Sequence, residues 1–234
     1  MTNTMPGKAK VMIGMVAVAS LCPLLFGVTN WRMPAWHQLA LLMAAAALSS
    51  RLKLKLPGMT STMSGNLPVV LLGVTQLGLL SSLLVAVTAA VAQSYGSGKL
   101  KPVQFLFNTC TLMNACGLAY LAYHSRLFAA HGGPAVSLAV AASAYFLANT
   151  APVAGIIGLT EGNSPFALWH KIFLWSFPNY VIGAGLAAIA SFFVTITGMA
   201  GLVAVLFGVY KSYKMYVGLT EHAHPKAFAM AASH

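Results

Sequence analysis

Long apolar stretches alternate with short polar connections along the chain. Apolar segments stand out at 11–29, 34–50, 65–79, 80–95, 103–124, 135–158, 169–193 and 198–217. A helix needs about 20 residues to cross a membrane fully, within a range of roughly 17–25. Most segments meet that length, so the pattern predicts an all-α, polytopic transmembrane helical bundle. Because 65–79 and 80–95 are short, we expect a total of about 6–8 spans.

The stretch from 57 to 68 interrupts this apolar pattern. Its helix-breaking and polar residues are Pro57, Gly58, Ser61, Thr62, Ser64, Gly65, Asn66 and Pro68. Irregular backbone at membrane depth is tolerated only where protein or a water-filled cavity covers it. We therefore expect a short broken or re-entrant hairpin near 57–95, with irregular backbone shielded by the bundle and the turn at 56–58 on the cytoplasmic surface. The preceding residues 50–57 alternate basic and apolar side chains, which indicates contact with anionic lipid headgroups.

The basic residues predict the orientation of the chain. If the N-terminus is cytoplasmic, the outer loops carry only Arg32 and Arg126. The cytoplasmic segments then carry Lys8, Lys10, Arg51, Lys53, Lys55, Lys99, Lys101, Lys171, Lys211, Lys214 and Lys226. Cytoplasmic loops are enriched in Lys and Arg. Two crossings or none at the short hairpin leave the later segments on the same side, so we expect both termini to be cytoplasmic. Trp31, Trp36 and Trp169 are interpreted as interfacial anchors.

Composition agrees with a membrane protein. Of the 234 residues, 59% are hydrophobic and only 6% are charged, and the mean hydropathy is +0.79. A soluble domain carries about 25% charged residues, so lipid must cover most of this surface. The net charge of +11 does not indicate nucleic acid, because no basic stripe with interleaved aromatic residues is present. We expect one transmembrane domain at 1–217, a short cytoplasmic tail at 218–234, and membrane lipids as partners.

The sequence offers little for catalysis. Its two acidic residues are Glu161 and Glu221, and it contains no Asp. Hydrolysis needs an activated nucleophile with an oriented base, and proton pumping usually needs a carboxylate inside the membrane. His222 and His224 form an H-x-H pair without a third ligand nearby. The three cysteines lie in apolar segments and read as buried thiols. We therefore predict no enzyme activity, no catalytic residue and no metal site, and the sequence names no cofactor.

Polar residues inside the apolar segments are the best candidates for function, because they are costly in hydrocarbon. The candidate ligand-binding residues are Asn66, Gln76, Asn108, Asn114, Asn149 and Asn179. Asn108, Thr111 and Asn114 are spaced three apart and form one stripe on a helix. Asn149 and Asn179 lie near Pro152 and Pro178, where helices become irregular. These amides either join helices, at about 0.6–2 kcal/mol each, or line a ligand pocket.

Three stretches carry a resemblance to a known family. They read SRLKLKLPGMTSTMSGNLPVVLLGV, VQFLFNTCTLMNACGLAYLAYH and ANTAPVAGIIGLTEGNSPFALWHKIFLWSFPNYVIGAGLAA. Over residues 50–190 the chain resembles the MASE-type multi-helix membrane sensor domains of bacterial GGDEF and HD-GYP proteins. The resemblance implies a sensor in the bacterial cytoplasmic membrane. We expect no output domain after the last helix, so a separate signalling output protein would supply the nucleotide chemistry.

The helix pattern is also similar to the substrate-binding subunits of energy-coupling-factor vitamin transporters, which are helical, non-enzymatic and dependent on partner subunits. Together these observations favour a non-enzymatic, sensor-like membrane module that binds a small or lipid-like ligand or a partner protein. One alternative is a small-solute transporter or its substrate-binding subunit. Another is an accessory or scaffolding subunit of a larger complex with other membrane protein subunits, which the short loops and scarce acidic residues favour.

Overall fold

The computed structural model describes residues 5–31, 33–51, 53–55, 62–95, 102–198, 200, 203 and 207. The chain divides into two compact units, Met1–Ile189 and Ala190–His234. The packing described below belongs to the first unit. The predicted turn at 56–58, the tail at 218–234 and most of the predicted span at 198–217 lie outside the described residues.

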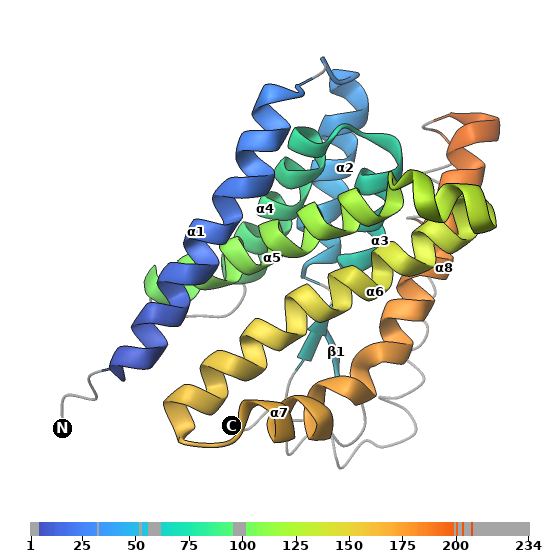
Figure 1. The fold of residues 1–234 in the computed structure, drawn as a ribbon. Helices are drawn as coiled ribbons and strands as arrows, with labels where there is room; N and C mark the ends of the chain where they lie inside the picture. The colour runs from blue at the N-terminus through green and yellow to red at the C-terminus, as the bar shows by residue number, and fades with distance from the viewer. Residues whose placement is uncertain are drawn as a thin grey trace, which may run out of the picture. The chain divides into compact units, whose positions relative to one another are not determined.

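Helices make up most of the described structure (Figure 1). In chain order the elements are α1 (Gly7–Thr29), α2 (Trp36–Ser49), β1 (Lys53–Lys55), β2 (Thr62–Ser64), α3 (Leu67–Gln76), α4 (Leu79–Tyr95), α5 (Pro102–Tyr123), α6 (Arg126–Glu161), α7 (Pro165–Leu168), the π-helix η1 (Trp169–Phe173), the 3-10 helix η2 (Leu174–Ser176) and α8 (Phe177–Thr197). The apolar segments expected between 11 and 124 correspond to α1 through α5, with ends that agree to within about one turn.

Four of the described helices are long and apolar enough to cross a membrane. They are Gly7–Thr29, Pro102–Tyr123, Gly132–Glu161 and Phe177–Thr197. The apolar helices α2, α3 and α4 are shorter, at 10–17 residues. The helical membrane architecture is thus confirmed in the described part of the chain. A total of about 6–8 spans requires the shorter helices to cross as well, and that number stays a prediction.

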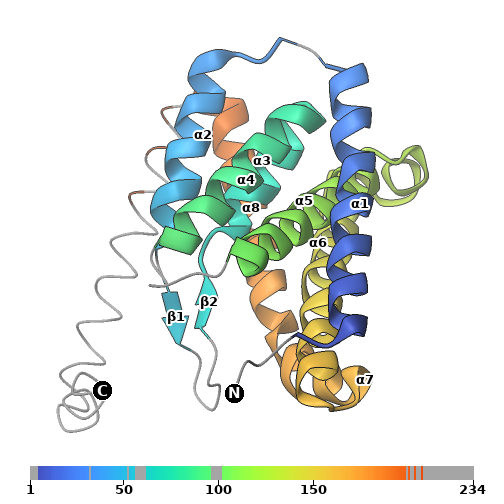
Figure 2. The same cartoon turned by 90° about the vertical axis from the view of Figure 1, so that its left-hand side faces the viewer.

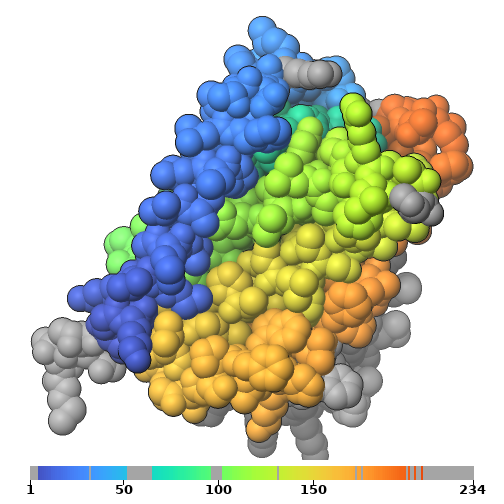
Figure 3. Space-filling model, viewed as in Figure 1, coloured from blue at the N-terminus to red at the C-terminus, as the bar shows by residue number. Residues whose placement is uncertain are grey.

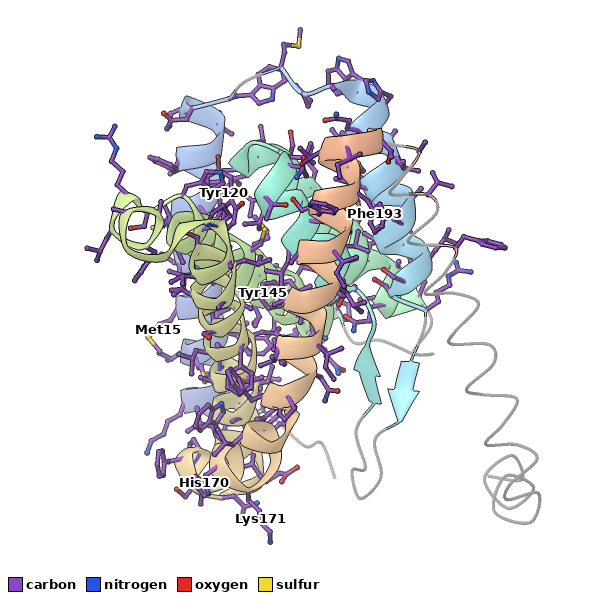
Figure 4. All side chains as sticks on the ribbon, turned by 90° about the vertical axis from the view of Figure 1, so that its right-hand side faces the viewer. Met15, Tyr120, Tyr145, His170, Lys171 and Phe193 are labelled. Atoms are coloured by element: carbon purple, nitrogen blue, oxygen red, sulfur yellow. The ribbon has the colours of Figure 1, made fainter. Side chains whose placement is uncertain are left out.

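Apolar side chains on the outer face of α1 have no protein covering them. Val11, Met15, Val18 and Leu25 are each more than 60% exposed. Met15 points away from the neighbouring helices in Figure 4. Scattered exposed apolar residues are ordinary in soluble proteins, but a whole exposed face of this kind is costly in water. Hydrocarbon is the environment that suits it.

The broken stretch after α2 contains regular structure that the sequence interpretation did not expect. Strands β1 and β2 pair antiparallel, with Lys53 opposite Ser64, Leu54 opposite Met63 and Lys55 opposite Thr62 (Figure 2). The expected irregular backbone is therefore replaced at 62–64 by a strand. The physical reason is that pairing two short extended segments satisfies backbone N–H and C=O groups where Pro and Gly prevent a helix.

Glycine and proline mark where α6 bends and ends. Gly133 has φ 66° and ψ −164°, so Arg126 begins a short lead-in helix that is bent away from the spanning part. Gly162, at φ 73°, ends the helix in the left-handed conformation that glycine adopts without a Cβ penalty. Pro152 lies inside α6, yet Gly133 is the only position in α6 with non-helical backbone angles.

The segment after α6 winds irregularly before α8 begins. The π-helix η1 and the 3-10 helix η2 stand directly before Pro178, the second residue of α8. Proline lacks an N–H and its ring clashes with the carbonyl four residues earlier, so an α-helix tends to begin at proline rather than run through it. The irregularity expected beside Pro178 is thus present.

Close contacts at glycine set the distances between helices. A Cβ atom added at Gly117 of α5 would lie 2.5 Å from Pro23 Cβ of α1, and one at Gly183 of α8 would lie 2.6 Å from Leu67 Cδ2 of α3. Small residues allow membrane helices to approach closely. Figure 3 shows α1 lying along α5 and α6 on one face of the first unit. Gly183 is one position where α8 uses a small residue in this way.

The α3–α4 hairpin reaches the end of α1 that leads to α2. A Cβ atom at Gly27, near the C-terminal end of α1, would lie 3.1 Å from the backbone N of Leu80, near the start of α4. The Leu77–Gly78 connection between α3 and α4 therefore lies close to the level of the last turns of α1. Figure 2 places the α1–α2 connection at this end of the unit and the β1–β2 ribbon at the other.

Replacing Gly117 by Ala tests the approach of α1 to α5. The new methyl group meets the rigid Pro23 ring, so we expect a loss of about 1–3 kcal/mol of unfolding free energy through overpacking. Thermal unfolding of the purified protein in detergent measures the effect.

Gly185→Ala is the matched control. Gly185 is exposed in a spanning helix, and a Cβ there meets nothing within 4 Å. Alanine is a better helix former by about 1 kcal/mol, so this variant should keep or raise the melting temperature. Equal melting temperatures for the two variants would contradict the Gly117–Pro23 contact.

Candidate functional site

Helix α5 is the centre of the first unit. It packs against α1, α3, α4 and α6. It also carries the polar stripe predicted from the sequence, Asn108, Thr111 and Asn114, together with Thr109. A helix surrounded by four others places its polar side chains away from lipid. Of these residues Thr111 is buried, and Asn108, Thr109 and Asn114 are partly buried.

Asn114 joins α5 to α1. Its side-chain Nδ2 donates a hydrogen bond of 3.0 Å to the backbone oxygen of Val16. The acceptor already belongs to the α1 helix, so the bond adds an interhelical link to a carbonyl with a spare lone pair. This geometry fits the hypothesis that the amides join helices.

Two threonines of α5 differ from every other threonine in the described helices. The others donate to a carbonyl three or four residues earlier; these are Thr29, Thr75, Thr88, Thr150, Thr160, Thr195 and Thr197. The Oγ1 atoms of Thr109 and Thr111 are buried and have no hydrogen-bond partner in the described structure. Thr111 is only 1% exposed.

A local acceptor exists for both threonines. The carbonyls of Phe105 and Phe107, four residues earlier, lie in the same regular helix. Such back-bonding is the usual solution for Ser and Thr inside helices. An unpaired buried hydroxyl costs about 1–3 kcal/mol. In the described structure neither hydroxyl uses this carbonyl, so both remain available for another partner.

The Ser137 hydroxyl of α6 is also buried and unpaired in the described structure, but for a different reason. The carbonyl four residues earlier belongs to Gly133, whose backbone is not helical. The usual acceptor is therefore turned away by the bend. Ser137 reflects the shape of α6 and is not counted as part of the candidate site.

A second polar cluster links α6 to η1 and α8. Asn149 Nδ2 donates to the Tyr180 hydroxyl at 3.0 Å. The next residue, Thr150, accepts a hydrogen bond from Trp169 Nε1 at 2.9 Å, and its own hydroxyl donates to the Phe146 oxygen at 2.7 Å. Two consecutive residues of α6 are thus hydrogen-bonded to η1 and to α8. We call Asn149, Thr150, Trp169 and Tyr180 the α6–α8 clamp.

Aromatic rings pack around the clamp. Phe146 contacts the rings of Trp169, Phe177 and Tyr180, with centroid distances of 5.8, 5.1 and 4.9 Å. Tyr145, labelled in Figure 4, lies between the helices and is 2% exposed. Such pairs add about 0.5–1.5 kcal/mol beyond area burial. The clamp is therefore a packed polar and aromatic core.

The predicted site residues fall in three places. Asn108 and Asn114 lie on α5, Asn149 of α6 belongs to the clamp, and Asn179 of α8 directly precedes the clamp residue Tyr180. Asn66 precedes α3 and Gln76 ends it, which separates them by about 15 Å at 1.5 Å per residue. Asn66 is buried, but its side chain makes no capping hydrogen bond to α3. The structure thus does not bring all six together, and their part in ligand binding stays a prediction.

Some members and contacts of these clusters were not indicated by the sequence. Trp169 stays predicted as an interfacial anchor, and its indole N–H also donates to Thr150, a contact that the sequence did not indicate. Trp31 and Trp36, at 52% and 60% exposed, have the exposure that anchors require. The sequence could have indicated Thr150 and Tyr180 as site residues, because each directly follows a candidate asparagine. Nothing comparable in the sequence indicated Tyr145.

Groups of three His, Cys, Asp or Glu side chains that could hold a metal ion are absent from the described residues. His222 and His224 lie outside them. Cys110 and Cys116 are buried free thiols as predicted, whereas Cys22 is exposed on α1. No family model, curated protein or solved structure matches this chain.

A double-mutant cycle on Trp169→Phe and Thr150→Val tests the clamp. Each change removes one side of the indole–hydroxyl bond and keeps most of the packing volume. We expect the two single losses of stability to be non-additive by about 0.6–1.7 kcal/mol, the range of interhelical hydrogen bonds in membranes. Unfolding in detergent measures the four proteins.

The control cycle pairs Thr150→Val with Trp36→Phe, which changes an exposed indole at the start of α2. Its effects should add, because the sites share no partner. Additive effects in the Trp169 cycle as well would show that the clamp contributes nothing beyond its separate side chains.

Proposed function

We propose that this chain is a non-enzymatic, sensor-like integral membrane module that binds a small or lipid-like ligand beside α5. One observation carries the proposal: Thr109 and Thr111 present buried hydroxyls without a partner in the described structure, on the helix that packs against α1, α3, α4 and α6. Each unpaired buried hydroxyl costs about 1–3 kcal/mol. A ligand that pairs with one of them recovers that free energy.

Because these hydroxyls are enclosed by protein, ligand binding requires a movement of helix α5. Their oxygen atoms are covered by protein, so a ligand reaches them only when α5 shifts against a neighbouring helix. Binding and rearrangement are then a single event, and the ligand favours the shifted arrangement by its differential affinity. This is the behaviour that a sensor requires.

The arrangement of the first unit supports the predicted topology. Lys8 and Lys10 open α1, and His170 and Lys171 lie at the same end of the unit in Figure 4, while Tyr120 lies at the opposite end. Arg126 begins α6 at the Tyr120 end. Within the proposal, the lysine-rich end is cytoplasmic, the short helices complete a bundle of about 6–8 spans, and a separate output protein binds at that end.

Thr111→Val tests the proposed function. Valine keeps the shape of threonine and removes the unpaired hydroxyl, so the folded protein should be equally stable or more stable by about 1 kcal/mol. The ligand that co-purifies from the native membrane in nanodiscs, measured by mass spectrometry, should fall strongly. Loss of ligand without loss of stability separates binding from packing.

Thr88→Val is the control for this experiment, because the exposed Thr88 hydroxyl donates to Leu84 of its own helix at 2.8 Å. It should keep the ligand. An empty chain that carries other protein subunits at fixed stoichiometry would contradict the proposal and support an accessory subunit. Solute uptake by cells that express the chain would instead support a transporter.

A further inference from the structure

Acidic and basic side chains are absent from α5. The helix Pro102–Tyr123 contains no Asp, Glu, Lys, Arg or His. The nearest such residues along the chain are Lys101 before it and His124 and Arg126 after it. Across the chain the only acidic residues are Glu161 and Glu221, and Glu161 is exposed at the end of α6. A cation at the centre of α5 would therefore find no carboxylate.

Thr111 lies near the middle of its helix. It is nine residues from Pro102 and twelve from Tyr123, which at 1.5 Å per residue gives about 14 and 18 Å. Half of a hydrocarbon core is about 15 Å thick. If α5 spans the membrane, Thr111 is close to the midplane, where an uncompensated charge is most costly.

The groups at this level are hydroxyls and amides. Thr109 and Thr111 supply unpaired hydroxyls, and Asn108 lies one turn from Thr111. The Asn114 N–H is engaged with Val16 of α1. A hydroxyl donates one hydrogen bond and accepts up to two, without formal charge. Apolar neighbours complete the surroundings, among them the buried side chains of Phe107 and Leu112.

We propose that the ligand is a neutral, largely apolar molecule that carries a hydrogen-bond-accepting oxygen and enters from the lipid phase. The Thr111 hydroxyl donates to this oxygen, whereas Thr109, two residues earlier, faces a different side of α5. Acids, amines and metal ions are rejected because none of the described residues of α5 supplies a counter-charge at the site. This inference rests on the proposed function, since it specifies the ligand of the same site.

Four photoreactive probes with one common alkyl chain test the inference. They end in a methyl ester, a methyl ketone, a carboxylate or a quaternary ammonium group. Each is added to the full chain in phosphatidylcholine nanodiscs, and labelled peptides are mapped by mass spectrometry. We expect the ester and the ketone to label α5 about tenfold more than the charged probes. Thr111→Val should lower that labelling about fivefold, and Thr88→Val should not.

The outcomes separate this inference from the proposed function. Labelling of α5 by a charged probe that matches the neutral probes and depends on Thr111 would overturn the neutral-ligand inference and leave a binding site in place. If the neutral probes label α5 equally in the Thr111→Val variant, the labelling reflects ordinary lipid contact. That result would overturn the role of the Thr111 hydroxyl as the donor to the ligand. Absence of α5 labelling by all four probes would overturn the proposed function itself.

Discussion

A hydrogen-bonding group in hydrocarbon has no water to pair with, and the described structure follows from that constraint. Most of the backbone lies in helices, whose N–H and C=O groups pair internally. Where Pro and Gly prevent a helix before α3, the chain uses the β1–β2 ribbon instead. Side-chain hydroxyls follow the same rule, because most threonines donate to their own helix. Against this background the unpaired hydroxyls of Thr109 and Thr111 are exceptions that call for a partner.

The placement of charge complements the pairing of polar groups. The spanning part of α6, the helix α5 and the helix α8 contain no charged residue except Glu161 at the end of α6. A membrane protein that moves protons or ions usually keeps ionisable groups inside its bundle. Among the described residues, the buried polar side chains carry amides, hydroxyls, thiols and aromatic rings. Such groups recognise shape and neutral hydrogen-bonding partners, and the proposed ligand binding rests on them.

The helices themselves could be read from the sequence, because apolar length and flanking Pro, Gly and basic residues define them. Their contacts could not. In a soluble helix, an apolar stripe shows which side faces the core. In α1 and α5 the buried and lipid-facing sides are both apolar, so the pattern does not reveal the rotation of the helix. For that reason Asn114 was predictable as a buried polar residue, whereas its partner Val16 was not. For the same reason the contact of Trp169 with Thr150 could not be predicted.

The clamp offers a route by which a shift at α5 reaches the end of the unit that carries Lys171. Helices α5 and α6 pack against each other, so a displacement of α5 acts on α6. Asn149 and Thr150 hold Tyr180 and Trp169, and Trp169 begins the π-helix that contains Lys171. Single-turn π-helices are rare and are often found at functional sites. Asn149 and Thr150 are adjacent in α6 and bind one residue of α8 and one of η1. We therefore expect α6 to move together with the segment from η1 to the start of α8. Within the proposed function, this link converts ligand binding in the membrane into a change at the predicted cytoplasmic surface.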